Sequence, residues 1–106
     1  MTTVARRTRV LVGLPVYNGE AYLRQAIDSV LGQTFTDFQL FIADNASTDG
    51  TAAICQSYAA RDRRVRYHRH AANIGAMQNW YYTFRSTPSE YFIGAAHDLG
   101  LDAALA

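Results

Sequence analysis

Three short polar stretches of the 106-residue chain hold residue types that could bind a charged ligand. The first holds Tyr17 and Asn18, the second Asp44 and Asn45, and the third His97 and Asp98. An aromatic ring can stack on a nucleobase, and a carboxylate or amide oxygen can accept a hydrogen bond from an N–H at the edge of the base. Asp98 could hold a divalent cation, because Mg²⁺ needs few protein ligands when phosphates and waters fill its other positions. The combination suits a nucleoside diphosphate.

Each stretch also has an ordinary structural explanation. Residues 15–18 could be a simple strand-to-helix turn, Asp49 could cap a helix, and residues 97–98 could be a surface pair. Asn73 and Gly75 are residue types that turns favour. The three stretches all follow apolar runs, however, and the carboxyl ends of parallel strands meet at one edge of a sheet. Their joint occurrence therefore favours a binding site.

Several familiar nucleotide and catalytic motifs are absent from the sequence. Only Gly13 and Gly19 lie near the end of the first apolar run, so there is no G-x-G-x-x-G turn, and no P-loop motif occurs elsewhere. Neither a G-x-S-x-G nucleophile elbow nor zinc-type Cys/His spacing is present. We name no catalytic residue within the chain.

The elements that must position these residues follow from apolar periodicity. Apolar runs predict strands over residues 10–14, 38–43, 65–68 and 91–96. Between them, apolar residues three and four positions apart predict helices around Ile27, Ile54 and Trp80. Regular alternation predicts an α/β fold, a Rossmann-like parallel sheet of about four strands with flanking helices.

Local chemistry adds finer expectations. Pro15 should end the first strand, because proline has no amide to donate. Gly32 should close the first helix in a left-handed conformation. The third strand, with alternating polar residues, should lie at an edge, whereas residues 91–96 should form a buried strand.

Composition narrows the class of protein. Hydrophobic residues make up 49% and charged residues 18%, as in a globular domain, and the net charge of +1 argues against a nucleic-acid partner. Cys55 is the only cysteine, so no internal disulfide can form and a reducing compartment is expected. We therefore expect a cytoplasmic protein, held at the inner face of the membrane if other segments anchor the intact protein.

Taken together, several blocks resemble a family 2 glycosyltransferase. They read V-G-L-P-V-Y-N-G-E-A-Y-L, S-V-L-G-Q-T-F-T-D-F-Q-L, A-D-N-A-S-T-D-G-T, N-I-G-A-M-Q-N and A-A-H-D. The resemblance covers residues 10–98 and implies a GT-A fold, a nucleotide-sugar donor that is usually a UDP-sugar, and a Mg²⁺ or Mn²⁺ ion. Pro15 and Tyr17 match positions that line the base and ribose pocket. Asp44 and Asn45 match an acidic pair, one member of which reads the uracil.

The later blocks match the part of the family's site that approaches the sugar-diphosphate. Asn73, Gly75 and Asn79 fall on the loop and helix start after the third strand. His97 and Asp98 fall on the D-x-D-like segment, which makes Asp98 the candidate metal ligand. Related sequences often read H-D-D there, whereas this chain reads H-D-L, and the resemblance stops after Asp98. We expect residues 1–8 to form a disordered tail and residues 9–106 to be the nucleotide-sugar-binding half of a GT-A domain, without its acceptor half.

The resemblance implies transfer of a sugar to an unknown glycan, lipid or protein acceptor by an inverting, metal-assisted mechanism. The family's catalytic base lies in the acceptor half, so this chain is not expected to turn over alone. One alternative is a non-catalytic nucleotide-binding module. Another is a structural fragment that binds no nucleotide and self-associates through an exposed sheet edge.

Overall fold

The computed structural model describes residues 8–95, along which strands and helices alternate. The elements are β1 (Thr8–Val16), α1 (Leu23–Leu31), β2 (Phe38–Asp44), α2 (Thr51–Arg61), β3 (Val65–Arg69), α3 (Ala76–Arg85) and β4 (Ser89–Gly94). The predicted alternation is confirmed. β1 begins at Thr8, the last residue of the predicted tail; the other residues of that tail lie outside the described part.

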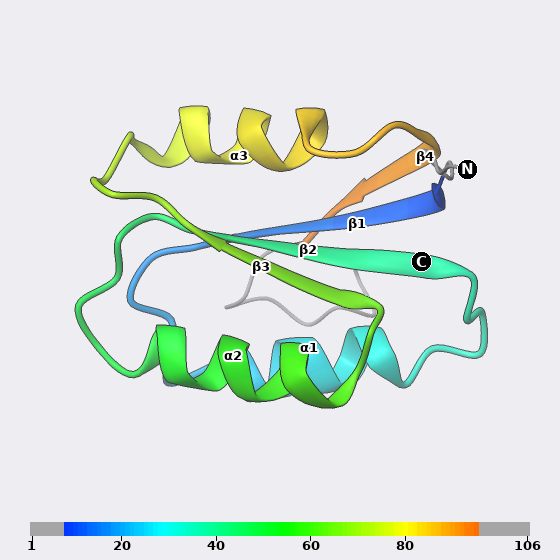
Figure 1. The fold of residues 1–106 in the computed structure, drawn as a ribbon, viewed down its shortest axis with the longest axis horizontal. Coiled ribbons are helices and arrows are strands. Elements are labelled where there is room, and N and C mark those ends of the chain that lie inside the picture. The colour runs from blue at the N-terminus through cyan, green and yellow to red at the C-terminus, as the bar shows by residue number, and fades with distance from the viewer. Residues whose placement is uncertain (1–7, 96–106) are drawn as a thin grey trace.

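The four described strands form one parallel sheet in the order β3-β2-β1-β4 (Figure 1). β1 pairs with β2 up to Val16 and Asp44, and with β4 up to Gly13 and Gly94. The predicted Rossmann-like fold class is therefore confirmed. The chain builds outward from β1 to β2 and β3, and then crosses β1 to add β4 on the other side. Open α/β sheets bind ligands at such a switch point, beyond the carboxyl ends of the strands.

Each face of the sheet has its own hydrophobic cluster, because successive strand residues point to opposite faces. Leu14 and Ile42 pack with Ile27 and other apolar side chains of α1 and α2. Leu11 and Phe41 lie on the opposite face. Figure 1 shows α1 and α2 together on one side of the sheet and α3 alone on the other.

The side chains of α3 that are buried against the sheet are polar. The buried residues of this helix are Asn79 and Thr83. The close approach depends on Gly13 of β1, where an added Cβ would lie 2.7 Å from Thr83 Oγ1. The apolar residues whose spacing predicted the helix are not buried; they are Met77, Trp80, Tyr81 and Phe84, which are 67%, 39%, 41% and 51% exposed.

Pro15 does not end β1, contrary to expectation. It pairs with Ala43 within the β1–β2 ladder, and β1 continues to Val16. The carbonyl of Gly13 accepts from Ala95 on the β4 side, whereas that of Val16 accepts from Asn45 on the β2 side. Because backbone groups alternate between the two sides, Pro15 turns its nitrogen toward the β4 side, beyond the last described β1–β4 pair. The ladder with β2 therefore loses no donor.

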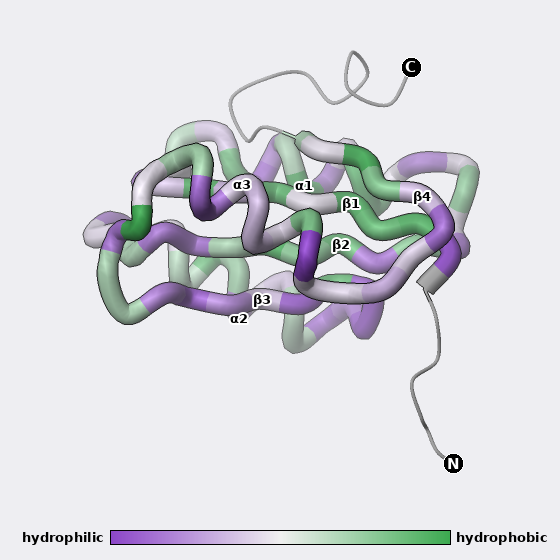
Figure 2. The backbone as a smooth tube through the Cα atoms, turned by 90° about the horizontal axis from the view of Figure 1, so that it is seen from above, coloured by the Kyte–Doolittle hydropathy of each residue, from purple (hydrophilic) through white to green (hydrophobic). Residues whose placement is uncertain are grey.

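Two further expectations were wrong, and one was right. Gly32 ends α1 with φ −85°, which is not left-handed. β4 is half-buried or exposed rather than buried, with Tyr91 60% exposed, because among the described strands only β1 flanks it. β3 does lie at an edge of the described sheet, and Figure 2 shows it as mostly hydrophilic, in contrast to the more hydrophobic β1 on the other side of β2. Within residues 8–95, every helix is too short and too polar to cross a bilayer.

Candidate functional site

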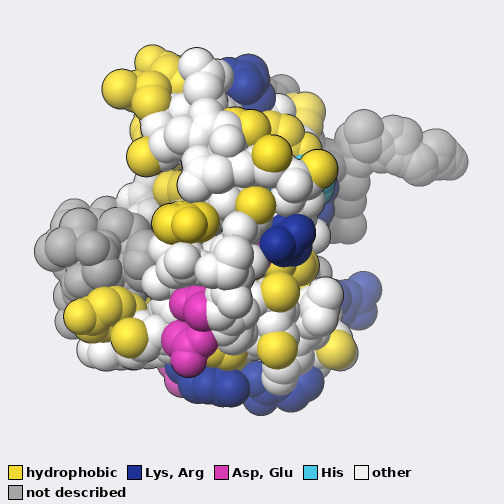
Figure 3. All heavy atoms as spheres, turned by 90° about the vertical axis from the view of Figure 1, so that its left-hand side faces the viewer, with side chains coloured by type: hydrophobic (Ala, Val, Ile, Leu, Met, Phe, Trp, Pro, Cys, Tyr) yellow, Lys and Arg dark blue, Asp and Glu magenta, His cyan; other side chains and the backbone are white. Residues whose placement is uncertain are grey.

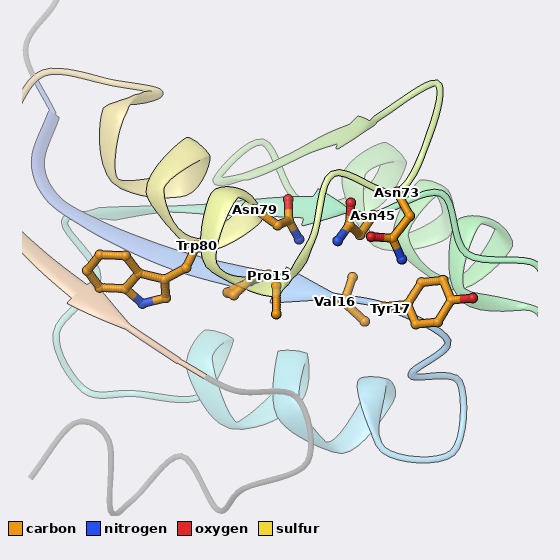
Figure 4. Close-up of a pocket in the computed structure, with 8 residues that line it drawn as sticks. Pro15, Val16, Tyr17, Asn45, Asn73, Asn79 and Trp80 are labelled. Carbon is orange, nitrogen blue, oxygen red and sulfur yellow. The ribbon is translucent and has the colours of Figure 1, made fainter.

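A cavity of about 380 Å³ opens beyond the carboxyl ends of β1 and β2, under the first turns of α3 (Figure 4). Its lining residues come from three segments of the chain: Pro15, Val16 and Tyr17; Asn45; and Asn73, Ala76, Asn79 and Trp80. The position is the one that the switch in strand order favours. A cavity of this size with a few polar groups is typical of small-molecule sites.

Asn18 is not among the cavity-lining residues; it connects the β1–α1 loop to the β2–α2 loop by hydrogen bonds. Its backbone has φ 50°, and its Oδ1 accepts the Thr48 amide at 2.8 Å. The backbone amide of Asn18 donates to Ser47 Oγ at 2.8 Å. The left-handed conformation is one that asparagine tolerates better than most residues. The β1–α1 loop is thereby held against the β2–α2 loop.

A second set of bonds extends this attachment to the start of α2. Asp49 accepts the Glu20 amide through Oδ2 at 3.3 Å and the Thr51 amide through Oδ1 at 2.9 Å. Glu20 Oε1 in turn accepts the Gly50 amide. Burial alone would raise the pKa of Asp49, but hydrogen bonds from Thr51 and Glu20 outweigh it and lower that pKa. Asp49 therefore joins the two loops and accepts the Thr51 amide at the start of α2, but the N-cap position predicted for it is occupied by Gly50.

Asp44 is fully buried and both of its carboxylate oxygens are engaged. Oδ1 accepts the Ser47 amide at 2.9 Å, and Oδ2 accepts the Tyr67 hydroxyl at 2.6 Å. Burial and this contact with Asp44 raise the pKa of Tyr67 well above its usual range. The side chain of Asp44 thus shapes the loop beside the cavity and does not line it.

Asn45 lines the cavity and is only 2% exposed. Its Oδ1 accepts the Ile74 amide at 2.8 Å, which sets the orientation of the side-chain amide. No described residue accepts a hydrogen bond from its Nδ2, which Figure 4 shows on the side of Pro15 and Val16. A buried N–H without an acceptor is costly. This donor is therefore available to a ligand in the cavity.

Asn73 and Gly75 form the turn that leads from β3 into α3. Asn73 lines the cavity, and its Oδ1 accepts the Gly75 amide at 2.8 Å. Gly75 has φ 90° and ψ 152°, a conformation open essentially to glycine alone. The carbonyl of Gly75 accepts the Asn79 amide at 3.0 Å and starts the helix. The turn sets where α3 begins above the cavity.

Asn79 lies in the cavity wall with both the nitrogen and the oxygen of its side-chain amide hydrogen-bonded. Nδ2 donates to the Ala43 carbonyl at 2.8 Å, and Oδ1 lies 2.7 Å from His70 Nε2. His70 was not among the predicted site residues; it is 8% exposed and lies just beyond β3. Asn79 therefore positions α3 against β2, and a ligand would meet its edge rather than a free polar group.

Aromatic side chains stand at the two ends of the cavity. Figure 4 shows Tyr17 at one end and Trp80 at the other, with Pro15 and Val16 between them. Tyr17 is 48% exposed, as a ring that can stack on a ligand must be. Sequence reasoning did not assign Val16, Ala76 or Trp80 to the site. The sequence analysis treated Trp80 as one of the periodic apolar residues of its helix. Its exposure could not be predicted, because the sequence does not say which face of α3 packs on the sheet.

Charged side chains are sparse around the described cavity. No Asp, Glu, Lys or Arg side chain lines it. Figure 3, which views this edge of the sheet, shows hydrophobic and uncharged side chains over most of the upper half and acidic side chains in one small group below. Residues 8–95 contain no group of three or more His, Cys, Asp or Glu side chains that could hold a metal ion. His97 and Asp98, the predicted D-x-D-like segment, lie outside the described residues.

Similar protein sequences support one family. Among curated proteins, an uncharacterized glycosyltransferase from Rickettsia typhi is 34% identical over 89 residues, which is 84% of this chain and 27% of that protein. Glycosyltransferase GlyA from Streptococcus pneumoniae is 33% identical over 72 residues, or 67% of this chain and 10% of that protein. The chain thus spans about a quarter or less of the length of these relatives.

Solved structures share the fold. The structure of TarS from S. aureus has a TM-score of 0.77 at 22% identity, over 85% of this chain and 27% of that one. A mannosyltransferase from Pyrobaculum calidifontis, in complex with GDP-Man and Mn²⁺, has a TM-score of 0.78 at 22% identity, over 88% of this chain and 28% of that one. The model of one family, Glycosyl transferase family 2, matches residues 11–100. Because that match covers most of the chain and includes every element that builds the cavity, the chain belongs to glycosyl transferase family 2.

Proposed function

We propose that the cavity binds a nucleotide-diphosphate sugar, in particular a UDP-sugar, and that the intact protein transfers this sugar to an acceptor. The observation that carries the proposal is the placement of Tyr17 and the free Asn45 Nδ2 in one cavity at the switch point of the sheet. A half-exposed aromatic ring and a buried hydrogen-bond donor suit a flat heteroaromatic base with carbonyl oxygens.

The choice of a uridine nucleotide has independent support from proteins of the same fold. TarS structures of this fold are described in complex with UDP-GlcNAc and with UDP. The related mannosyltransferase is described with GDP-Man, so guanine is the principal competitor. Uracil offers carbonyl oxygens to Asn45 Nδ2, and its ring is small enough to stack on Tyr17 alone. We therefore expect UDP to bind more tightly than GDP.

We also propose a divalent cation, Mg²⁺ or Mn²⁺, for the diphosphate. The described cavity offers amides and apolar groups, which do not by themselves form a cation site, and the oxygens of Asp44 and Asp49 are already engaged. Asp98 is the residue that we assign to the cation, together with the phosphates and water. When bound, such an ion would neutralise the charge that develops on the departing diphosphate.

The residues of this chain would bind and orient the donor. In the inverting transfer that we propose, an acceptor hydroxyl oxygen forms a bond to the anomeric carbon while the bond from that carbon to the diphosphate oxygen breaks. The hydroxyl proton passes to a general base, which we place in the acceptor-binding part of the longer protein. The acceptor, a glycan, lipid or protein, is bound there as well. The described residues supply the loop attachments and the α3 position that keep the donor site in shape.

Titration calorimetry of the chain with UDP, GDP and dTDP tests the proposal, with Mn²⁺ and then with chelator. We expect UDP to bind more tightly than GDP, and more tightly with Mn²⁺ than with chelator. Absence of heat with every nucleotide in both conditions would refute the donor site. A non-catalytic nucleotide-binding module would bind UDP equally well, and is distinguished by the absence of sugar transfer from UDP-sugars when the full-length protein is assayed.

Two further expectations remain predictions. The cytoplasmic location, at the inner membrane face if other segments provide an anchor, awaits fractionation of cells. Self-association through the β4 edge predicts a dimer in sedimentation velocity, and a monomer at every concentration would contradict it.

A further inference from the structure

Trp80 occupies the end of the cavity farthest from Tyr17 (Figure 4). It belongs to the first half of α3 and is 39% exposed. Of the other labelled lining residues, Pro15 and Asn79 lie toward Trp80 in Figure 4. Pro15 carries no hydrogen-bonding side chain, and the side-chain amide of Asn79 is bonded to Ala43 and His70. At the Tyr17 end, by contrast, the lining includes the side-chain amides of Asn45 and Asn73. The cavity thus has one end rich in hydrogen-bonding groups and one end that is apolar.

The indole of Trp80 is held in place by other aromatic rings. It stacks on Phe84 with centroids 6.0 Å apart and meets the edge of Phe92 at 5.9 Å. Phe84 and Phe92 also contact each other, at 5.0 Å, so the three rings form one cluster between α3 and β4. Beneath the indole lies Gly94, where an added Cβ would stand 3.2 Å from Trp80 Nε1. A ring fixed by its neighbours loses little freedom when a ligand packs on it.

A nucleotide sugar, like the cavity, has one end rich in hydrogen-bonding groups and one end with an apolar face. Its base is flat and carries several hydrogen-bonding groups, whereas a pyranose ring presents a face of C–H groups that packs well on an aromatic ring. Lying along the cavity with its base at Tyr17, such a ligand would direct its sugar toward Trp80.

We propose that Trp80 is the platform for the sugar ring of the donor, and so a residue that distinguishes a sugar nucleotide from the free nucleotide. This inference rests on the proposed function, because it takes the base to lie at Tyr17. It assigns a part of the ligand to the apolar end of the cavity, which the proposed function leaves unspecified.

The chain itself provides a spectroscopic test, because Trp80 is its only tryptophan. Acrylamide quenching of emission, excited on the red edge of indole absorption, reports the accessibility of this single ring. We expect saturating UDP-glucose or UDP-GlcNAc to lower the quenching constant about twofold or more, since a packed sugar covers an exposed ring face, and UDP to leave it near the value of the free chain. Equal protection by UDP and by the sugar nucleotides would overturn the proposal, because the base or phosphates would then cover the ring.

Binding measurements with variants provide the second test. Trp80→Ala should weaken UDP-hexose binding about tenfold, the scale of one aromatic contact, and change UDP binding by less than about twofold. Trp80→Phe, which keeps an aromatic face, should restore most of the UDP-hexose affinity. Tyr91→Ala is the matched control, because Tyr91 is an exposed aromatic residue of β4 outside the cavity lining. It should bind both ligands like the unaltered chain.

The outcomes separate this inference from the proposed function. If the unaltered chain binds neither UDP nor UDP-hexose, the donor site itself is refuted, and the role of Trp80 falls with it. If UDP binds and Trp80→Ala weakens UDP and UDP-hexose equally, or weakens neither, the donor site stands and the sugar platform is refuted.

Discussion

His70 and Asn79 share a buried hydrogen bond, with 2.7 Å between Nε2 and Oδ1. Asn79 Nδ2 already donates to the Ala43 carbonyl, so its Oδ1 is the acceptor and His70 Nε2 carries the proton. The two bonds connect the segment after β3, the first half of α3 and the end of β2. Three elements that surround the cavity thus meet at one side-chain amide.

Asn79→Ala should therefore destabilise the fold by about 2 to 3 kcal/mol, because it leaves the buried Ala43 carbonyl and His70 Nε2 without their partner. Urea denaturation measures this loss. Gln78→Ala, an exposed change in the same helix, is the control and should stay within about 0.5 kcal/mol. An Asn79→Ala chain as stable as the control would show that the amide bridge contributes little.

Gly75→Ala isolates the backbone at the start of α3. An added Cβ would touch nothing within 4 Å, so any effect must come from the φ of 90°. That conformation costs a residue with a side chain about 1 to 3 kcal/mol. We expect a loss of this size in urea denaturation, and weaker UDP binding in calorimetry because the Asn73 turn shifts. Unchanged stability would mean that the turn relaxes to a conformation open to alanine.

The sequence predicted where strands and helices lie better than it predicted what packs against each of them. Periodic apolar residues mark strands and helices because each must bury one face, and Ile27, Ile42 and Leu14 are fully buried as that rule requires. Periodicity does not say what covers a face. Trp80 has helical spacing with its apolar neighbours, yet the buried residues of α3 are Asn79 and Thr83, and Trp80 packs at the β4 edge and stays 39% exposed.

The sequence also did not show which way the backbone or side chain of a single residue points. Whether Pro15 breaks a ladder depends on which neighbouring strand its nitrogen faces, and that follows from the sheet order. Asp44 and Asn45 are adjacent in sequence, but the side chain of Asp44 accepts hydrogen bonds from Ser47 and Tyr67, whereas Asn45 lines the cavity. Residue type pointed to a loop that borders the cavity, and only the fold showed that the side chain of Asp44 bonds within the protein whereas Asn45 lines the cavity.

Alkaline pH should destabilise the folded chain through its buried thiol. Burial, followed by the charge of Asp44, raises the pKa of Cys55 from 9.0 to about 12. Between these values the folded state keeps a proton that the unfolded state releases, so the free energy of unfolding falls as the pH rises from 9.0 toward about 12. The contribution of Cys55 to this slope is at most about 1.4 kcal/mol per pH unit.

Urea denaturation of Cys55→Ala across this alkaline range measures the effect. The variant is expected to be less stable than the unaltered chain near neutral pH, because a buried side chain has been shortened, but to lose stability less steeply above pH 9. Ser57→Ala, an exposed change in α2, should keep the original slope. Parallel pH profiles for all three chains would contradict the assignment.

Tyr17→Ala tests the base end of the cavity. Removing a stacking ring should weaken UDP binding by about 1 to 3 kcal/mol, to the same degree with Mn²⁺ and with chelator, since stacking does not involve the cation. The ring is 48% exposed, so thermal stability should change little. Tyr91→Ala again serves as the aromatic control. An unchanged affinity for UDP would remove Tyr17 from the base pocket.

Asp98→Ala tests the cation assignment by the opposite pattern. If Asp98 holds a divalent ion against the diphosphate, its loss should weaken UDP binding when Mn²⁺ is present and leave binding in chelator unchanged. Uridine, which has no phosphate, should bind both chains alike under either condition. Asp102→Ala is the matched control, an acidic residue four positions further along the chain, and it should retain the Mn²⁺ dependence. An equal loss of UDP affinity with and without Mn²⁺ would show that Asp98 acts on the nucleotide by another route, and the cation would then need ligands from the rest of the intact protein.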